Sequence, residues 1–168
     1  FNFIFCKPIY YKISNIKIKI FATDISEKSI AKARTGQYQK RELEGVSESR
    51  LQQFFTKTDG TYQVKKTIRD MCVFAVHNFL KDPPFAKMDF ISCRNVLIYM
   101  EPFLQKKAFT TFHYALNEKG YLLLGKAETT GTASASELFL SVNNKEKLYT
   151  RNTLPGRFMN VASERREE

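Results

Sequence analysis

The sequence lacks the features that would point to a membrane, secreted or metal-binding protein. No apolar run among its 168 residues reaches the roughly 20 residues needed to span a bilayer. The three cysteines, Cys6, Cys72 and Cys93, stand far apart, without the close spacing of metal ligands or of a disulfide framework. We therefore expect reduced thiols, no metal site, no membrane insertion and a cytoplasmic protein.

Basic residues outnumber acidic ones, but they form no concentrated patch in the sequence. The net charge is +10, which is compatible with a nucleic acid, an anionic membrane surface or an acidic protein as partner. Proteins that bind single-stranded nucleic acid interleave basic and aromatic residues, and no such run is present. We expect an acidic protein partner and no nucleic acid.

Apolar strand patterns alternate with helix patterns along most of the chain. The segment 16–24 reads as a strand that stops at Asp24, and a helix capped by Ser26 follows it and ends at Gly36. Further strands are predicted over 71–76, 89–93 and 121–125, a helix over 103–116, and an antiparallel pair over 139–142 and 147–150. This order predicts an α/β fold with a mostly parallel sheet and a C-terminal antiparallel pair.

Three segments do not follow the alternation. Residues 1–15 have no clear period and receive no assignment. Residues 37–70 are polar, with a predicted helix capped at Ser47 and a hairpin turning at Asp59-Gly60, and we expect this insertion to pack on the main sheet. Residues 152–168 are expected to be disordered. The main domain is therefore assigned to residues 16–151.

Two of the predicted strands end on polar residues that could contact a nucleoside. Asp24 could accept hydrogen bonds from both ribose hydroxyls, or it could help to cap the helix that begins after Ser26. Asn78 could pair with an adenine edge, or it could stabilise the turn into Phe79. The two histidines receive no role, and His113 is expected to face solvent.

A third strand end carries a sharper set of residues. Arg94 can hold a carboxylate through two parallel hydrogen bonds, and Asn95 can reach the same ligand. Tyr99 can share a turn that faces the crevice at the carboxyl ends of the strands. Because parallel strands point these ends towards one edge of the sheet, we expect Asp24, Asn78 and Arg94 to lie at that edge together. The alternatives are a salt bridge at a strand end for Arg94 and an aromatic side chain in the core for Tyr99. Spacing alone leaves both interpretations open.

Taken together, several segments resemble the CheR family of chemotaxis receptor methyltransferases over roughly residues 16–151. The segments are Ile20-Phe21-Ala22-Thr23-Asp24-Ile25-Ser26, Gly36-Gln37-Tyr38, Phe74 to Asn78, Asp89 to Tyr99 with its Cys-Arg-Asn-Val-Leu-Ile-Tyr element, and Gly120 to Glu128. The resemblance implies a partial Rossmann-like S-adenosylmethionine-dependent methyltransferase fold. It also implies methylation of glutamate side chains of chemoreceptors in bacterial chemotaxis, with S-adenosylhomocysteine as product.

The resemblance also implies roles for individual residues. Asp24 corresponds to the ribose ligand, and Asn78 and Phe79 to the adenine contacts, although the family usually has leucine at the position of Phe79. Arg94 and Asn95 correspond to residues at the methionine end of the cofactor. Tyr99 corresponds to a tyrosine near the transferred methyl group, so Arg94 and Tyr99 are the implied catalytic residues.

The resemblance further implies a partner, the cytoplasmic domain of a chemoreceptor. The insertion at 37–70 corresponds to the small β-subdomain that contacts the receptor. Some relatives bind a receptor tail peptide through a loop of this subdomain. The turn at 58–61 is too short for that loop, so we expect no tail-peptide binding.

One departure concerns the cofactor. The family carries a glycine-containing cofactor loop before the first matching strand, whereas the first glycine here is Gly36 and residues 1–15 do not match that loop. We therefore expect this chain to bind S-adenosylmethionine weakly or not at all. The alternative function is a catalytically inactive, truncated remnant that binds a receptor or another partner.

Overall fold

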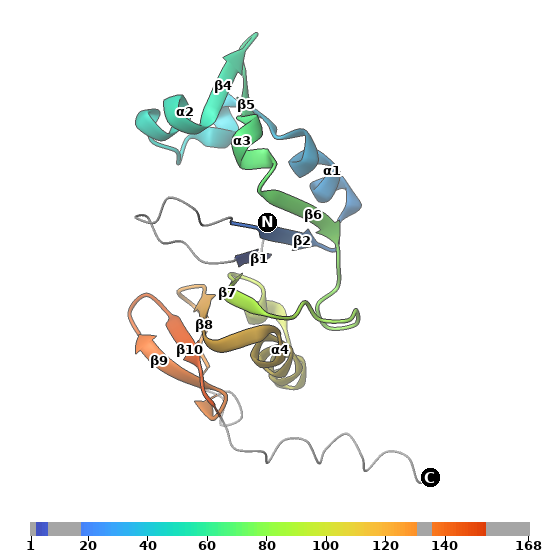
Figure 1. Cartoon of the computed structure of the whole chain (residues 1–168), viewed down its shortest axis with the longest axis vertical. Helices are drawn as coiled ribbons and strands as arrows, with labels where there is room; N and C mark the ends of the chain where they lie inside the picture. Colours follow the sequence, from blue (N-terminus) through green and yellow to red (C-terminus); the bar gives the residue numbers. More distant parts are fainter. Residues whose placement is uncertain (1–2, 7–17, 131–135, 154–168) are drawn as a thin grey trace.

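A seven-stranded sheet forms the centre of the molecule, in the order β6-β2-β1-β7-β8-β10-β9 (Figure 1). The computed structural model describes residues 3–6, 18–130 and 136–153, and of residues 3–6 it describes the backbone only. The strands are β1 Phe3–Cys6, β2 Ile20–Asp24, β6 Cys72–Val76, β7 Met88–Cys93, β8 Leu116–Leu124, β9 Phe139–Asn143 and β10 Leu148–Arg151. Every strand predicted from the sequence is therefore present.

The sheet is mixed, so the prediction of a mostly parallel sheet was wrong. Among the described strands, only β2 with β6 and β7 with β8 are parallel neighbours. The strand β1 runs antiparallel to both β2 and β7, and β10 runs antiparallel to both β8 and β9. The C-terminal antiparallel pair was predicted correctly.

The unexpected element is β1, which lies inside the segment that the sequence left unassigned. It occupies the middle of the sheet, with Phe3 paired with Thr23 on one side and with Cys93 on the other. Only residues 7–19 separate β1 from β2. Antiparallel neighbours can be joined by a short connection, whereas parallel neighbours need a longer crossover that usually contains a helix. The reversed direction of β1 is consistent with this short connection.

Helix α1, Glu27–Thr35, begins and ends as the sequence predicts. The Ser26 hydroxyl accepts a hydrogen bond from the Ser29 N–H at 3.2 Å, which is the expected N-cap. Gly36 closes the helix in the left-handed conformation, with φ of 63°, and its N–H donates to the carbonyls of Lys32 and Ala33.

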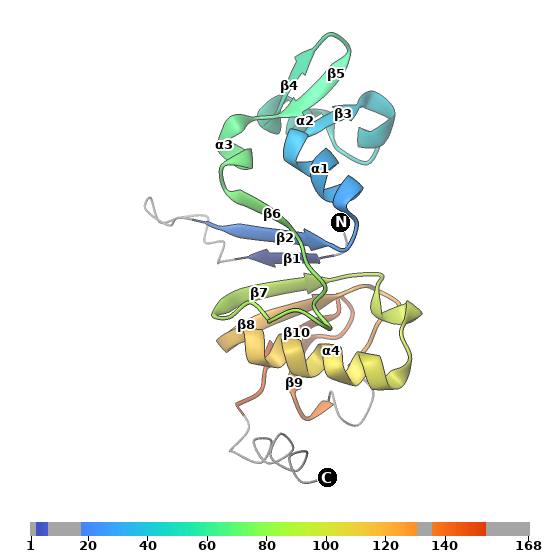
Figure 2. The same ribbon diagram turned by 90° about the vertical axis from the view of Figure 1, so that its right-hand side faces the viewer.

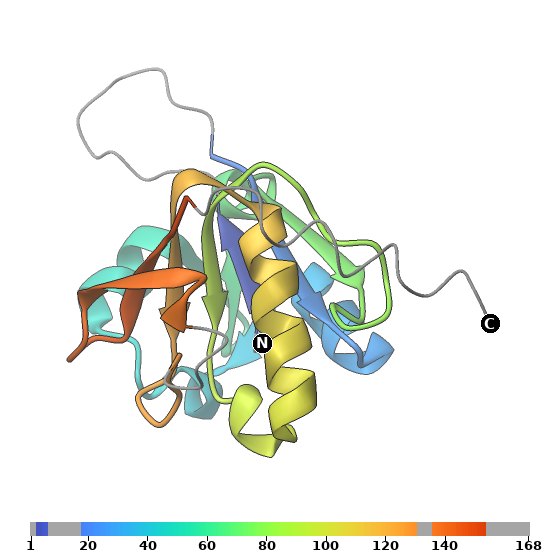
Figure 3. The same cartoon turned by 90° about the horizontal axis from the view of Figure 1, so that it is seen from below.

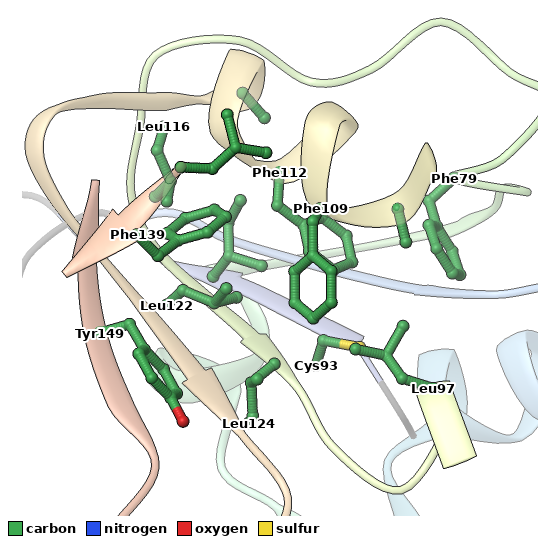
Figure 4. Packing of buried hydrophobic residues seen from close by; sticks show 14 of the residues in the cluster. Phe79, Cys93, Leu97, Phe109, Phe112, Leu116, Leu122, Leu124, Phe139 and Tyr149 are labelled. Atoms are coloured by element: carbon green, nitrogen blue, oxygen red, sulfur yellow. The ribbon is translucent and has the colours of Figure 1, made fainter. Parts of the chain in front are cut away.

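The main hydrophobic core lies between the sheet and helix α4, Pro102–Ala115 (Figures 2 and 3). Pro102 occupies the first turn of α4, where its missing N–H costs nothing. Figure 4 shows Phe109 and Phe112 of α4 projecting towards the strands, with Cys93 and Leu97 beside them. The fully buried aromatic rings of α4 therefore anchor the ends of β7 and β8.

The prediction that His113 faces solvent was wrong, because its side chain is half-buried. Its Nε2 lies 2.9 Å from the carbonyl oxygen of Asn152, and its ring packs edge-on against Phe139. Burial lowers the pKa of His113. It lies over β9, where a polar ring is tolerated because the Asn152 carbonyl accepts a hydrogen bond from its N–H.

The insertion forms a small sheet of its own, β3-β5-β4, with a separate core of Leu43, Leu51 and Tyr62. Its elements are β3 Gln37–Gln39, the 3-10 turn η1 Lys40–Leu43, α2 Glu48–Phe54, β4 Phe55–Thr58, β5 Thr61–Val64 and α3 Lys66–Arg69. The predicted hairpin is present, with left-handed Asp59 and Gly60 at its turn. The small sheet lies beyond β6, the edge strand of the main sheet, so the insertion adjoins the edge of that sheet (Figures 1 and 2).

Three remaining predictions have different outcomes. The apolar run over 71–76 predicts a buried strand, but β6 is an edge strand and only partly buried. Cys72 and Cys93 are free thiols. The predicted disorder over 152–168 falls almost wholly on residues 154–168, which lie outside the described part of the chain. Within the described part, no helix is both long and apolar enough for a membrane crossing.

Candidate functional site

The three polar strand ends lie at the same edge of the main sheet, as predicted. Asp24 is the last residue of β2 and pairs with Val76 at the end of β6, two residues before Asn78. Phe3 pairs with both Thr23 and Cys93, so β2 and β7 end side by side across β1. Asp24, Asn78 and Arg94 therefore follow strands that point in one direction, towards one edge.

A cavity of about 250 Å³ opens at this edge. Its lining residues come from the ends of β2 and β6 and from the segment after β7: Asp24, Ile25, His77, Asn78, Phe79, Leu80, Val96 and Met100. Sites that enclose a drug-sized ligand are typically about 300–1,000 Å³. The cavity therefore suits one part of a larger ligand, such as its nucleoside.

Asp24 combines the two interpretations that its sequence position left open. Its Oδ1 accepts a hydrogen bond from the Ser26 N–H at 2.9 Å, which stabilises the turn into α1. Its Oδ2 accepts no hydrogen bond from the described residues, and the side chain lines the cavity. One carboxylate oxygen is thus available to a hydroxyl donor.

Asn78 shows the same division. The side-chain Oδ1 of Asn78 accepts from the Leu80 N–H at 3.0 Å, which stabilises the turn after β6. The backbone N–H of Asn78 donates to Oδ2 of Asp82 at 2.7 Å in the same turn. Its side-chain NH₂ forms no hydrogen bond with the described residues. That group can donate to a ring nitrogen of a bound base. Phe79 also lines the cavity, although its ring stacks on Phe112 in the core with a centroid distance of 5.5 Å.

His77 lines the cavity as well, although the sequence suggested no role for it. Its Nε2 lies 3.1 Å from the carbonyl oxygen of Pro83, which can only accept, so Nε2 carries a proton. Its Nδ1 is buried and has no hydrogen-bond partner among the described residues. The strand-end rule that singled out Asn78 would have found His77 too, because it directly follows β6.

The residues after β7 fall into two groups. Val96 and Met100 line the cavity, whereas Arg94, Asn95 and Tyr99 are exposed and do not line it. Arg94 forms no ion pair within the described chain, so the expected alternative of a salt bridge is absent there. The alternative of a core position for Tyr99 was wrong, because its side chain is 84% exposed on the 3-10 turn η2, Leu97–Tyr99.

Glu128 holds this segment in place, and the sequence did not identify it. Its carboxylate is buried and accepts four backbone hydrogen bonds, from the N–H groups of Asn95, Val96, Leu97 and Gly125 at 2.6–3.0 Å. We call these five residues the Glu128 network. The available signal was the position of Glu128, three residues after Gly125 at the end of the fourth predicted strand.

Cys93, next to the Glu128 network, has an apolar environment. Cys93 is fully buried directly before the turn, and burial, reinforced by the nearby charge of Glu128, raises the pKa of its thiol. A thiol with a raised pKa stays protonated and is a poor nucleophile at neutral pH. Cys93 is therefore a core residue, in spite of its place next to the site.

The cavity residues match the chemistry of a nucleoside. The free Asp24 oxygen can accept from ribose hydroxyls, the Asn78 amide can donate to a base, and Leu80, Val96 and Met100 supply apolar walls. In the described part of the chain, no group of His, Cys, Asp and Glu side chains could hold a metal ion. An adenosine-containing cofactor therefore fits the residues that are present.

Comparisons with known proteins identify the family of the chain. Residues 4–147 match the model of the family described as CheR methyltransferase, SAM binding domain. A 104.1 kDa uncharacterised protein of Rhodobacter capsulatus is 42% identical over 66% of this chain and 12% of its own length. A putative methyltransferase Cher3 of Pseudomonas putida is 30% identical over 77% of this chain and 50% of its own. A chemotaxis protein methyltransferase of Vibrio parahaemolyticus is 36% identical over 72% of this chain and 46% of its own.

The chain spans at most half the length of these three relatives. Among solved structures, the N-methyltransferase NodS of Bradyrhizobium japonicum, in complex with S-adenosylhomocysteine, aligns with a TM-score of 0.45 and 14% identity, covering 80% of this chain and 66% of that one. That likeness is too low to add to the assignment. The family match covers most of the chain, and so the protein belongs to the CheR methyltransferase family, of which it carries the S-adenosylmethionine-binding domain.

Proposed function

We propose that this chain is the cofactor-binding part of an S-adenosylmethionine-dependent methyltransferase that forms methyl esters on glutamate side chains of chemoreceptors in the cytoplasm. The observation that carries the proposal is the pair Asp24 and Asn78. Each has one polar group engaged in its own turn and one polar group left over, in the same apolar-walled cavity. The family assignment supplies the class of cofactor.

The β2–β6 side of the crevice would hold the nucleoside. Asp24 would accept from the ribose hydroxyls through Oδ2, and Asn78 would donate to the adenine ring. Phe79 would close the base site while its ring stays stacked on Phe112. Each of these side chains is fixed in advance by the protein, so little conformational entropy is lost on binding.

The β7 side would face the methionine end and the substrate. Bound S-adenosylmethionine would supply an electrophilic methyl group. Arg94, which is exposed and forms no ion pair within the described chain, would hold a carboxylate, with Asn95 next to it and Tyr99 near the acceptor. A glutamate side chain is ionised at neutral pH, so the reaction needs no general base and depends on positioning and partial desolvation.

The proposed partner is the cytoplasmic domain of a chemoreceptor. The net charge of +10 would favour encounter with an acidic segment. The small sheet is a candidate for receptor contact because it lies apart from the main core, beyond β6. Its β4–β5 turn contains only Asp59 and Gly60 between the paired residues Thr58 and Thr61, and we expect no micromolar binding of a receptor tail peptide.

One observation favours the alternative of an inactive binding module. The strand β1 fills the centre of the sheet in the reverse direction, so its first residue, Phe3, lies at the crevice edge. In nucleotide-binding α/β folds the central strand ends at this edge and leads into a glycine-rich loop that approaches the ligand. A sheet with a reversed central strand would hold the cofactor from one side only.

A transfer assay separates the two functions. The chain would be incubated with methyl-labelled S-adenosylmethionine and a receptor cytoplasmic domain, and base-labile label on the receptor would be counted. We expect incorporation that is lost with Arg94→Ala and retained with Lys145→Ala, an exposed cation between β9 and β10 that forms no ion pair within the described chain. Cofactor binding without transfer would favour the binding module, and absence of both would overturn the proposal.

A further inference from the structure

Glu128 accepts four backbone hydrogen bonds beside the crevice, although its side chain is buried and does not line the cavity. Its side chain is only 3% exposed, and the described chain offers it no cationic partner. Oε1 accepts from the N–H groups of Val96 and Leu97, both at 2.8 Å, and Oε2 from those of Asn95 and Gly125 at 3.0 and 2.6 Å. A buried carboxylate tolerates the loss of hydration when several backbone N–H groups donate to it.

The network continues the pairing of two neighbouring strands beyond their last paired residues, Cys93 and Leu124. Gly125 follows β8, and Asn95 to Leu97 follow β7. A Cβ atom on Gly125 would lie 2.5 Å from Oδ1 of Asn95 and 2.6 Å from Oε2 of Glu128, so only glycine leaves room for this approach. Glu128 thus bridges the ends of two parallel strands at the edge where the cavity opens.

The bridge determines the path of the chain after β7. Asn95 adopts the left-handed conformation, with φ of 60°, which asparagine tolerates better than most residues. From this turn Leu97 enters the core and is 2% exposed, Val96 reaches the cavity wall, and Arg94 and Tyr99 remain exposed. Arg94 directly precedes the backbone that Glu128 holds, and the N–H groups of Tyr99 and Met100 donate to the carbonyls of Val96 and Leu97 within it.

We infer that Glu128 is a positioning residue that fixes the Asn95–Leu97 turn and, through it, the wall of the cofactor cavity and the placement of Arg94 and Tyr99. A carboxylate is suited to this task because both of its oxygens only accept. A glutamine of the same size has one accepting oxygen and one donating NH₂ group. Glu128→Gln would therefore turn the NH₂ group towards two of the four N–H donors and release them.

The test compares Glu128→Gln with Glu42→Gln in the whole chain. Glu42 also accepts a backbone N–H through its side chain, from Gln39, but it is exposed and lies in the small-sheet region. The first readout is amide hydrogen exchange by NMR. In Glu128→Gln we expect exchange at two or more of Asn95, Val96, Leu97 and Gly125 to rise at least about tenfold more than exchange in β2, β6 and α4. Glu42→Gln leaves these four amides unchanged.

The second readout is affinity for S-adenosylhomocysteine, and it alone rests on the proposed function. We expect roughly tenfold weaker binding by Glu128→Gln and unchanged binding by Glu42→Gln. A merely structural role would lower global stability with uniform exchange and unchanged affinity, and that result would overturn the inference. If the wild-type chain itself does not bind, the proposed function fails, while the exchange comparison still decides the role of Glu128.

Should Glu128→Gln fail to fold, Glu128→Asp provides the second variant. It keeps the charge but shortens the side chain by one methylene, so it reaches fewer of the four donors. We expect the same local pattern of exchange with a smaller rise. Uniform protection across the four amides and the strands, as in the wild type, would contradict the inference.

Discussion

The two sides of the crevice are built in different ways. On the β2–β6 side, the site residues stabilise their own turns, because Asp24 accepts from the N–H of Ser26 and Asn78 from that of Leu80. On the β7–β8 side, the side chains of Arg94 and Tyr99 form no hydrogen bond or ion pair with the described residues. There a buried residue from another strand end, Glu128, supports the backbone on which they lie.

On the β2–β6 side, the same residues therefore serve ligand binding and stability. On the β7–β8 side, different residues serve the two roles. Changing Asp24 should disturb both its turn and any ligand contact. Changing Arg94 or Tyr99 should alter the surface presented to a ligand and leave the fold unchanged. The β7–β8 side can vary its exposed residues at little structural cost as long as its buried support is kept.

The largest expected effect tests the support beneath the β7–β8 side. Phe109 is fully buried on α4 and packs edge-on against Phe112 and Phe139. Phe109→Ala should lower the free energy of unfolding by about 3–5 kcal/mol, because it removes apolar contacts and leaves a cavity. The control is Phe103→Ala on the same helix, which is 72% exposed and should change stability by less than about 0.5 kcal/mol. Equal effects in urea denaturation would show that α4 is not the support we describe.

A smaller effect is expected from crowding the Glu128 network. Gly125→Ala would place a methyl group against Asn95 and Glu128 and should destabilise the protein by about 1–3 kcal/mol. Gly45→Ala is the matched control, because a Cβ at Gly45 meets nothing within 4 Å. Thermal unfolding of both variants checks the prediction. A neutral Gly125→Ala would mean that the two strand ends can move apart freely.

The β2–β6 side should respond differently to two substitutions at one position. Asp24→Ala removes the acceptor for the Ser26 N–H and should cost about 1 kcal/mol of stability, whereas Asp24→Asn keeps an acceptor and should cost less. Chemical denaturation of the two variants measures the difference. If both variants are as stable as the wild type, the turn does not depend on Asp24, and the contrast between the two sides is lost.

The smallest effects are expected at the exposed residues of the β7 side. Arg94→Ala and Tyr99→Phe should each change the unfolding free energy by less than about 0.5 kcal/mol, because both side chains are exposed and neither has a hydrogen-bond or ion-pair partner in the described part of the chain. Their thermal unfolding curves should overlay that of the wild type. A loss above about 1 kcal/mol for Arg94→Ala would reveal a structural role, in place of the division that we describe.

Much of the fold could be predicted because its elements carry local signals. The N-cap at Ser26, the left-handed cap at Gly36 and the turn at Asp59-Gly60 depend only on nearby residues, and the structure contains all three. The direction of β1 could not be predicted, because Phe3–Cys6 is too short to carry a pattern that distinguishes parallel from antiparallel pairing.

The site shows the same limit. Strand ends on Asp24, Asn78 and Arg94 were visible in the sequence, and so was their common edge. The role of Glu128 was not, because its four donors lie 31–33 residues away or belong to its own turn, and no local pattern connects them. Likewise, periodicity along α4 did not reveal that His113 packs against Phe139 of β9 and contacts the carbonyl of Asn152.

The most direct test of the central claim is the binding of S-adenosylhomocysteine and of adenosine, measured by calorimetry at up to millimolar ligand on the wild type, Asp24→Ala and Arg94→Ala. Because the cavity encloses only the nucleoside side, we expect weak but saturable binding of both ligands. Both should weaken at least about tenfold in Asp24→Ala, and adenosine binding should be unchanged in Arg94→Ala. Absence of saturable binding to the wild type, or binding that is indifferent to Asp24, would contradict the assignment of this cavity to the cofactor.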